Sequence, residues 1–317
     1  MLPFINTDIL LFAFALAFCM LCFAAVCSGA WFVVITEASG IATKKKFQDK
    51  CAFQTGKLCT ILLIAYILAF ISLISVNIQN GNNLLEGVLA LPVTLIMSLL
   101  GTAFLLFSLY LATWKTLKKA KIIHLSIGIL IALILSSAFV LIAMLLRTVL
   151  HSGSELTEYS SIIILVTELF NSIPLNSIVW PLIIQAFLLG FATIGALNLV
   201  WIMIVRNKDN FGRDYYNFTL SYSSAWAILG TLGGLVTGAF VFYRGWVGMS
   251  PSLAQFPQTW LLITNIALPS FACLLWLFII RSNTPLRHKF SAWFALIFLI
   301  LSVTAQILLT NEIMPAS

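Results

Sequence analysis

Charged residues are scarce in this sequence. They make up 9% of the 317 residues, whereas hydrophobic residues make up 61%. A soluble domain carries about 25% charged residues, so these few charges cannot cover a water-exposed surface. The apolar residues gather in runs long enough to cross a lipid bilayer, which predicts a polytopic membrane protein with the bilayer as its first partner. The net charge of +7 lies mostly in loops and does not indicate nucleic-acid binding.

The cysteines lack the spacing that a cofactor site needs. Cys19 and Cys22 form a C-x-x-C, but Phe23 follows where a c-type haem requires histidine. No second pair of metal ligands accompanies them at recognisable spacing, which argues against a structural zinc site. We interpret Cys19, Cys22 and the nearby Cys27 as small packing residues, with a redox or cofactor role as the alternative.

Histidine is also scarce, with three residues in the chain. A membrane b-type haem needs axial histidines inside the helix bundle. His124 and His151 lie near opposite ends of one predicted helix, about 40 Å apart at the helical rise per residue, so they cannot bind the same haem. We expect both to be solvated residues at the membrane interfaces. The sequence argues against a haem and predicts no metal site.

Eight apolar segments are long enough to cross about 30 Å of hydrocarbon. A further apolar run, Ile162–Val166, is too short to cross, and we expect an interfacial helix there on the outer side. The predicted fold is all-α: a single transmembrane domain over residues 1–317, with a bundle of about eight transmembrane helices and one outer interfacial helix. The predicted spans are 9–35, 58–77, 86–112, 122–146, 180–205, 220–242, 260–280 and 290–310.

The basic residues predict the orientation of the chain. All but Arg147 and Arg244 of the 17 basic residues fall in four loops on one side of the membrane. By the positive-inside rule this side is cytoplasmic. Both termini then lie on the periplasmic side of a bacterial cytoplasmic (inner) membrane. The loop residues are Lys44, Lys45, Lys46, Lys50, Lys57, Lys115, Lys118, Lys119, Lys121, Arg206, Lys208, Arg213, Arg281, Arg287 and Lys289.

Polar side chains inside the predicted spans are candidates for function, because they are costly in hydrocarbon. No Asp, Glu, Lys or Arg falls at mid-membrane, which weakens the case for a pump or a proton-coupled carrier. Glu37 and Glu86 fall at span ends, and we interpret them as interface residues. Amides that fall deeper have either a functional role or join helices through hydrogen bonds worth about 0.6–2 kcal/mol. They are Gln185, Asn198, Asn265 and Gln306.

A group of charged residues on the outer side is not explained by the orientation. Arg147 ends the fourth predicted span, and His151, Glu168 and Arg244 lie on the same side. These four residues are candidates for binding a quinone headgroup, a partner subunit or an anionic lipid. The alternative is an ordinary solvated rim.

Glycine recurs at every fourth residue of the sixth predicted span. Gly230, Gly234 and Gly238 form a G-x-x-x-G-x-x-x-G stripe. Small residues on one stripe let two helices approach closely. The pattern predicts a helix-packing face, and leaves open whether the neighbouring helix belongs to the same chain.

Two short motifs carry a resemblance to a known family. One is CMLCFAAVCSGAWFVVITE (19–37), followed by a short basic loop, and the other is WPLIIQ (180–185). They resemble bacterial membrane subunits distantly related to subunit I of cytochrome bd quinol oxidases. Such proteins tend to have a histidine early in the first motif and W-P-x-x-x-H in the second. Cys19 and Gln185 stand at those positions here, so the resemblance implies a member without its haem ligands, retained in a quinone-linked assembly.

Three hypotheses for the function follow from these features. The leading one is a haem-less integral subunit of a quinone-linked respiratory or electron-transfer complex, not catalytic on its own. Quinone is its candidate ligand, and other subunits of the complex are its candidate partners. A small-solute permease is the first alternative, favoured by the helix count, the prolines within helices and the deep amides. A structural membrane protein that assembles through the glycine stripe is the second.

Overall fold

All regular secondary structure in the described part of the chain is helical. The computed structural model describes residues 7–79, 89–152, 161–171, 173–206, 211–247 and 256–313. No strand occurs in these ranges. Eight of the described helices are long and apolar enough to cross a membrane, and one apolar helix is too short. The predicted all-α, polytopic membrane fold is therefore confirmed.

Each long helix overlaps one of the predicted spans. They are α1 (Thr7–Thr43), α2 (Lys46–Gln79), α3 (Ala90–Ala112), α4 (Lys121–Ser152), α6 (Val179–Val205), α7 (Arg213–Val247), α8 (Phe256–Arg281) and α9 (Lys289–Ile313). The short helix α5 (Ile162–Asn171) covers the apolar run that is too short to span. Two 3₁₀ turns, η2 (Thr116–Lys119) and η4 (Pro285–Arg287), lie in connections on the basic side.

Several helices run beyond their apolar segments at the basic end. α1 extends to Thr43 and α2 begins at Lys46, so only Lys44 and Lys45 separate them. Lys44 has a φ of 55°, a left-handed conformation that ends a helix. Polar residues that follow the apolar run of α1, including Glu37, therefore occupy ordered helical positions and can meet residues of other helices.

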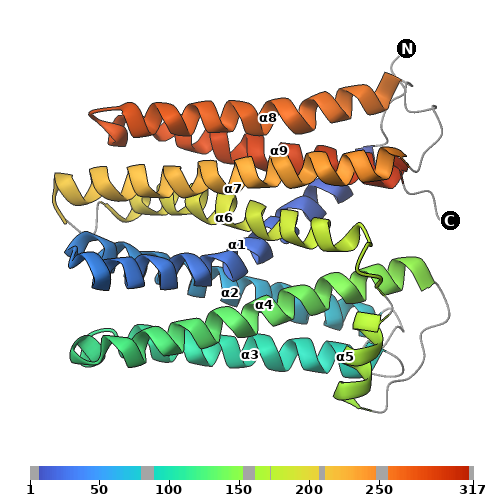
Figure 1. The fold of residues 1–317 in the computed structure, drawn as a ribbon, viewed down its shortest axis with the longest axis horizontal. Helices are drawn as coiled ribbons and strands as arrows, with labels where there is room; N and C mark the ends of the chain where they lie inside the picture. The colour runs from blue at the N-terminus through green and yellow to red at the C-terminus, as the bar shows by residue number, and fades with distance from the viewer. Residues whose placement is uncertain are drawn as a thin grey trace. The chain divides into compact units, whose positions relative to one another are not determined.

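The helix contacts divide the chain into two compact units. Unit 1 comprises the described residues of Met1–Ala25 and Ile184–Ser317, and unit 2 those of Val26–Ile183. In unit 1, α7 packs against α8, and α8 and α9 form a hairpin (Figure 1). In unit 2, α3 packs against both α2 and α4. The short helix α5 contacts α3 and α4 and buries Leu165 and Leu169.

Small residues fill much of the core of unit 1. Trp276 is fully buried there among alanines from four helices, and apolar side chains such as Leu199 and Leu299 pack around them. The alanines let the helix backbones approach closely, as membrane helices do where no hydrophobic effect drives their association. They are Ala192, Ala196, Ala227, Ala272, Ala292 and Ala295.

Candidate functional site

Three polar side chains meet inside unit 2 and form a carboxylate–imidazole cluster (Glu37, Tyr110 and His124). His124 Nδ1 lies 2.6 Å from Glu37 Oε1, and the Tyr110 hydroxyl donates a 2.6 Å hydrogen bond to Glu37 Oε2. His124 Nε2 lies 2.9 Å from the backbone carbonyl oxygen of Tyr110. Glu37 and His124 are each 3% exposed, and Tyr110 is 0% exposed. Both oxygens of the carboxylate and both ring nitrogens thus have partners within the protein.

The hydrogen bonds of the cluster require a shared proton. A carbonyl oxygen can only accept, so the His124 nitrogen that faces the Tyr110 carbonyl carries a proton. The short contact between the other ring nitrogen and Glu37 needs a further proton, which resides on the imidazole or on the carboxyl group. In both states the Glu37–His124 pair is neutral overall. Such a pair is much less costly to bury than either charge alone.

Three helix ends bring the cluster together. Glu37 lies near the end of α1, Tyr110 near the end of α3, and His124 in the first turn of α4. The His124 ring stacks on Tyr110 at a centroid distance of 4.1 Å, and Trp114 meets it edge-on at 4.9 Å. Gly128 of α4 leaves room for this stack, because a Cβ there would lie 3.2 Å from the Tyr110 ring. Aromatic rings therefore cover the imidazole.

A more exposed ion pair lies at the same helix ends. Lys121 Nζ, one turn before His124 on α4, is 2.6 Å from Asp49 Oδ2 on α2. The two side chains are 33% and 30% exposed. Exposed ion pairs contribute about 0–1 kcal/mol, and this pair is partly exposed, with Asp49 Oδ1 buried and without a hydrogen-bond partner among the described residues. The Asp49–Lys121 pair therefore provides a natural comparison for the buried cluster.

The expectation that His124 is solvated is wrong, because the side chain is buried and paired with Glu37. Glu37 is buried as well, and its position at a membrane interface stays a prediction. The helices continue past the apolar runs, so these residues still face other helices. A signal was available in the sequence. Glu37, Tyr110 and His124 each lie about two residues from a predicted span end on the basic side, which puts them at the same depth.

Two of the deep amides form a closed pair in unit 1. Gln185 Nε2 on α6 donates to Gln306 Oε1 on α9 at 3.2 Å, and Gln306 Nε2 donates back to Gln185 Oε1 at 2.8 Å. Gln185 is 5% exposed. Gly238 of α7 faces the same amide, since a Cβ there would lie 2.5 Å from Gln185 Nε2. Protein atoms therefore enclose the polar end of Gln185.

The other two amides also connect helices of unit 1. Asn198 Nδ2 on α6 donates a 2.8 Å hydrogen bond to Ser223 Oγ on α7. Ser302 Oγ on α9 donates to Asn265 Oδ1 on α8 at 3.1 Å. The Asn198 Oδ1 atom is buried without a hydrogen-bond partner among the described residues. In these contacts the amides join helices through hydrogen bonds, one of the two roles expected for deep amides.

The Gln185–Gln306 pair predicts a strong thermodynamic coupling. Replacing either glutamine by leucine leaves the other amide buried and unpaired, which costs about 1–3 kcal/mol. The double variant Gln185→Leu/Gln306→Leu removes both groups and should recover most of that loss. The free energies of unfolding from SDS titrations would give a coupling of about 0.6–2 kcal/mol. Strictly additive single effects would contradict the reciprocal pairing.

The residues of the predicted outer binding group fall in different settings. Arg147 is half-buried on α4, and Glu168 is exposed on α5, both in unit 2. Arg244 is exposed on α7 of unit 1. The side chain of His151 lies outside the described part of the structure, as does Glu86. A joint site of these outer residues therefore stays a prediction.

The glycine stripe of α7 lies against α6 of the same chain. A Cβ on Gly230 would lie 2.3 Å from the Ala192 nitrogen and 2.6 Å from the Leu188 carbonyl oxygen. A Cβ on Gly234 would lie 2.7 Å from the end of the Leu189 side chain. The third glycine of the stripe faces the amide pair. This face is thus occupied within the chain, and assembly with another protein through it would require α6 to leave.

The α1 cysteines have different surroundings. Cys19 is exposed, Cys22 is partly buried, and Cys27 is buried, with all three thiols free. The Cys27 thiol donates a 3.4 Å hydrogen bond to the Leu135 carbonyl oxygen of α4. Among the residues that the structure describes, no three or more His, Cys, Asp or Glu side chains gather as a metal site would require. Cys27 therefore serves the packing of α1 against α4.

No known protein-family model matches this chain, and no curated protein matches its sequence. The resemblance to cytochrome bd subunits thus rests on the two motifs. The relatives' haem can be compared with the residues at the two ligand positions of this chain. Gln185 is enclosed by Gln306 and Gly238, and Cys19 is exposed on α1. These donors do not fit a haem held by axial ligands inside the bundle.

Proposed function

We propose that the chain is a haem-less integral subunit of a quinone-linked electron-transfer complex, in which the carboxylate–imidazole cluster holds a proton for the reaction. The observation that carries the proposal is the buried Glu37–His124 pair with its shared proton. Ionisable groups inside membrane helices are costly, and their usual roles are in substrate binding and proton relays. The first motif, which ends at Glu37, resembles subunits related to quinol oxidases. This resemblance is why we propose a quinone as the partner of the proton chemistry.

Quinone chemistry has a use for such a group. Reduction of a quinone to a quinol takes up electrons and protons in equal number, and oxidation releases them. In this proposal the electrons pass through cofactors of partner subunits, while this chain handles protons. His124 Nδ1 can pass the shared proton to Glu37 Oε1 along their 2.6 Å contact. The Tyr110 hydroxyl holds the second carboxylate oxygen in place.

The charge distribution assigns the cluster to one side of the membrane in this proposal. The cluster lies at the helix ends next to the basic connections, which would face the cytoplasm by the positive-inside rule. Protons would then enter from the cytoplasm of a bacterial cell, and both termini would be periplasmic. On the opposite side, Arg147, His151, Glu168 and Arg244 are the candidates for contact with a quinone headgroup or a partner subunit.

The proposal is tested on the full chain purified with the subunits that accompany it. Glu37→Gln should slow electron transfer to decylubiquinone about 100-fold, the scale of a lost proton-transfer group. The matched control Asp49→Asn also neutralises a carboxylate at these helix ends but should leave the rate unchanged. Equal rates for the two variants, or a preparation without partners and without quinone-linked activity, would overturn the proposal. A Soret band of the purified chain would overturn its haem-less part.

The buried cluster also favours a second candidate, a proton-coupled solute permease. The sequence weakened this function because no Asp, Glu, Lys or Arg falls at mid-membrane. The Glu37–His124 pair supplies a buried ionisable pair at the basic end of the helices. The purified chain alone would be placed in liposomes that contain the pH dye pyranine. Amino acids, hexoses and nucleosides would be added outside in turn. A luminal pH change that Glu37→Gln abolishes would favour the permease over the electron-transfer subunit.

A further inference from the structure

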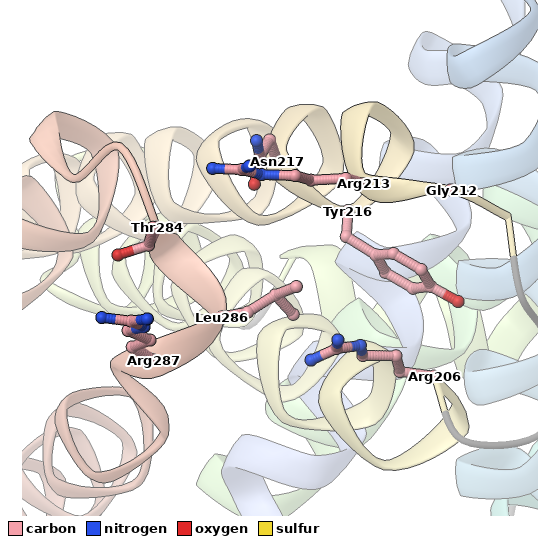
Figure 2. Close-up of a pocket in the computed structure, with 8 residues that line it drawn as sticks. All are labelled: Arg206, Gly212, Arg213, Tyr216, Asn217, Thr284, Leu286 and Arg287. Carbon is pink, nitrogen blue, oxygen red and sulfur yellow. The ribbon is translucent and has the colours of Figure 1, made fainter.

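Three arginines of unit 1 line one cavity where its helices meet their connections. The cavity has a volume of about 290 Å³ and is lined by Arg206, Arg213 and Arg287 together with Tyr216, Asn217 and Thr284. We call it the arginine pocket. Arg206 follows α6, Arg213 begins α7, and Arg287 ends the η4 turn before α9. Figure 2 shows that these guanidinium groups come from three separate segments of the chain.

No acidic side chain is among the described residues that line the pocket. Asp214, which follows Arg213 in the first turn of α7, is the nearest carboxylate in sequence, and it is not part of the lining. Arg206 lies over the ring of Tyr216, with 6.0 Å from the guanidinium carbon to the ring centroid. This contact orients a cation without reducing its charge. The pocket therefore gathers three guanidinium charges in one small space.

The lining groups match the chemistry of a phosphate. Guanidinium groups present a fork of donors that bind phosphate oxygens in pairs. The Asn217 amide and the Thr284 hydroxyl add neutral donors beside them. Arg213 and Asn217 lie one turn apart at the start of the 35-residue helix α7, where the helix dipole also favours an anion.

We propose that the arginine pocket binds a phosphate-bearing anion, either the headgroup of an anionic phospholipid or a small soluble phosphate ester. Basic pockets at the cytoplasmic ends of membrane helices bind such headgroups. The volume of the pocket lies at the lower limit of ligand sites, about 300 Å³. It suits a single phosphate group with a short polar substituent. This site is independent of the proposed redox function, because it lies in unit 1 and shares no residue with the carboxylate–imidazole cluster.

The positive-inside rule alone would also place arginines at this end of the helices. Basic residues of the α8–α9 connection that do not line the pocket provide the control for this effect. Arg281 and Lys289 are exposed basic residues that flank η4 but do not line the pocket. The variants Arg213→Gln/Arg287→Gln and Arg281→Gln/Lys289→Gln each remove two positive charges, and only the first pair lines the pocket. Arg206 is left in place because it packs on Tyr216.

The experiment compares the wild-type chain with both double variants in two arms. In the first, the purified full chain is titrated with vesicles of phosphatidylglycerol and phosphatidylcholine at a ratio of about 1:4, which is on the order of natural anionic content. Vesicles of phosphatidylcholine alone are the comparison. The lipid retained by the chain is counted by native mass spectrometry. In the second, detergent-solubilised chain is titrated with glycerol 3-phosphate, and its thermal unfolding is followed. Circular dichroism checks that both variants are folded.

The proposal predicts a loss that is specific to the pocket. Loss of Arg213 and Arg287 should weaken phosphatidylglycerol or glycerol 3-phosphate binding roughly 25-fold, about fivefold per arginine, whereas the Arg281/Lys289 variant should bind like wild type. Selectivity in the vesicle arm alone identifies a lipid ligand, and binding in the second arm identifies a soluble one. Equal losses in the two variants, or no pocket-dependent binding in either arm, would overturn the proposal.

Discussion

Gly230→Ala is expected to prevent the normal packing of α6 against α7. The added Cβ would lie 2.3 Å from the Ala192 nitrogen and 2.6 Å from the Leu188 carbonyl oxygen. Backbone atoms cannot swing aside as the end of a side chain can, so the two helices would have to separate. Overpacking that side chains can absorb costs about 1–3 kcal/mol, and we expect a loss above about 3 kcal/mol here. The unfolding of purified protein in SDS, followed by tryptophan fluorescence, measures it.

Gly101→Ala is the matched control for this substitution. No atom lies within 4 Å of the Cβ position at Gly101 in α3. Alanine is a better helix former than glycine by about 1 kcal/mol, so this variant should unfold at the same SDS concentration as wild type or above it. If Gly230→Ala matched Gly101→Ala, the close approach of α6 and α7 would be refuted.

Glu37→Leu is expected to destabilise unit 2 by about 3–5 kcal/mol, the cost of removing one partner of a buried ion pair. The His124 nitrogen and the Tyr110 hydroxyl that face Glu37 would both be left without an acceptor in a site that excludes water. The free energy of unfolding in SDS measures the effect. Asp49→Leu serves as the control, and its loss should be smaller because the Asp49–Lys121 pair is about one-third exposed, whereas Glu37 is 3% exposed.

The triple variant Glu37→Leu/Tyr110→Phe/His124→Leu separates the polar cost from the packing cost. The three polar side chains are removed and apolar side chains fill the space, while the Tyr110 carbonyl oxygen, which loses His124, keeps the Thr113 hydroxyl as a donor. Replacement of a whole buried ionic group by apolar residues is often neutral or stabilising. We therefore expect stability close to wild type together with loss of the proton-linked activity. If the triple variant were as unstable as Glu37→Leu, the loss of stability would come from packing and not from unpaired polar groups.

The helices of this protein could be predicted from its sequence because their signal is local. Uninterrupted apolar runs set the spans, and the run at Ile162–Val166 was recognisable as too short. The extent of α1 and α2 toward the basic side was not recognisable. Helical hydrogen bonding continues through Ser39 and Thr43 after hydropathy has fallen, and the break comes at Lys44. Hydropathy reports the solvent around a helix, not the end of the helix.

The candidate site was harder to predict because it depends on contacts distant in sequence. Glu37 and His124 are 87 residues apart, and each alone resembles an ordinary interface residue. Likewise, the sequence identified the glycine stripe but did not identify α6 as the helix that packs against it. Nothing in the sequence of α6 indicates which helix its small residues contact. Gln185 and Gln306 were found as deep amides for a simpler reason. Their cost in hydrocarbon follows from residue type and depth alone.

The glycine contact between α6 and α7 has a consequence for motion. The backbone atoms of Ala192 and Leu188 lie where a Cβ on Gly230 would be, so the two helix backbones are in close contact here. Sliding α7 along α6 would push a side chain into this contact, so the two helices should behave as one rigid body. Any conformational change within unit 1 must then occur away from the α6–α7 contact. A candidate hinge is α8, which carries Pro269 within its length and contacts both α7 and α9.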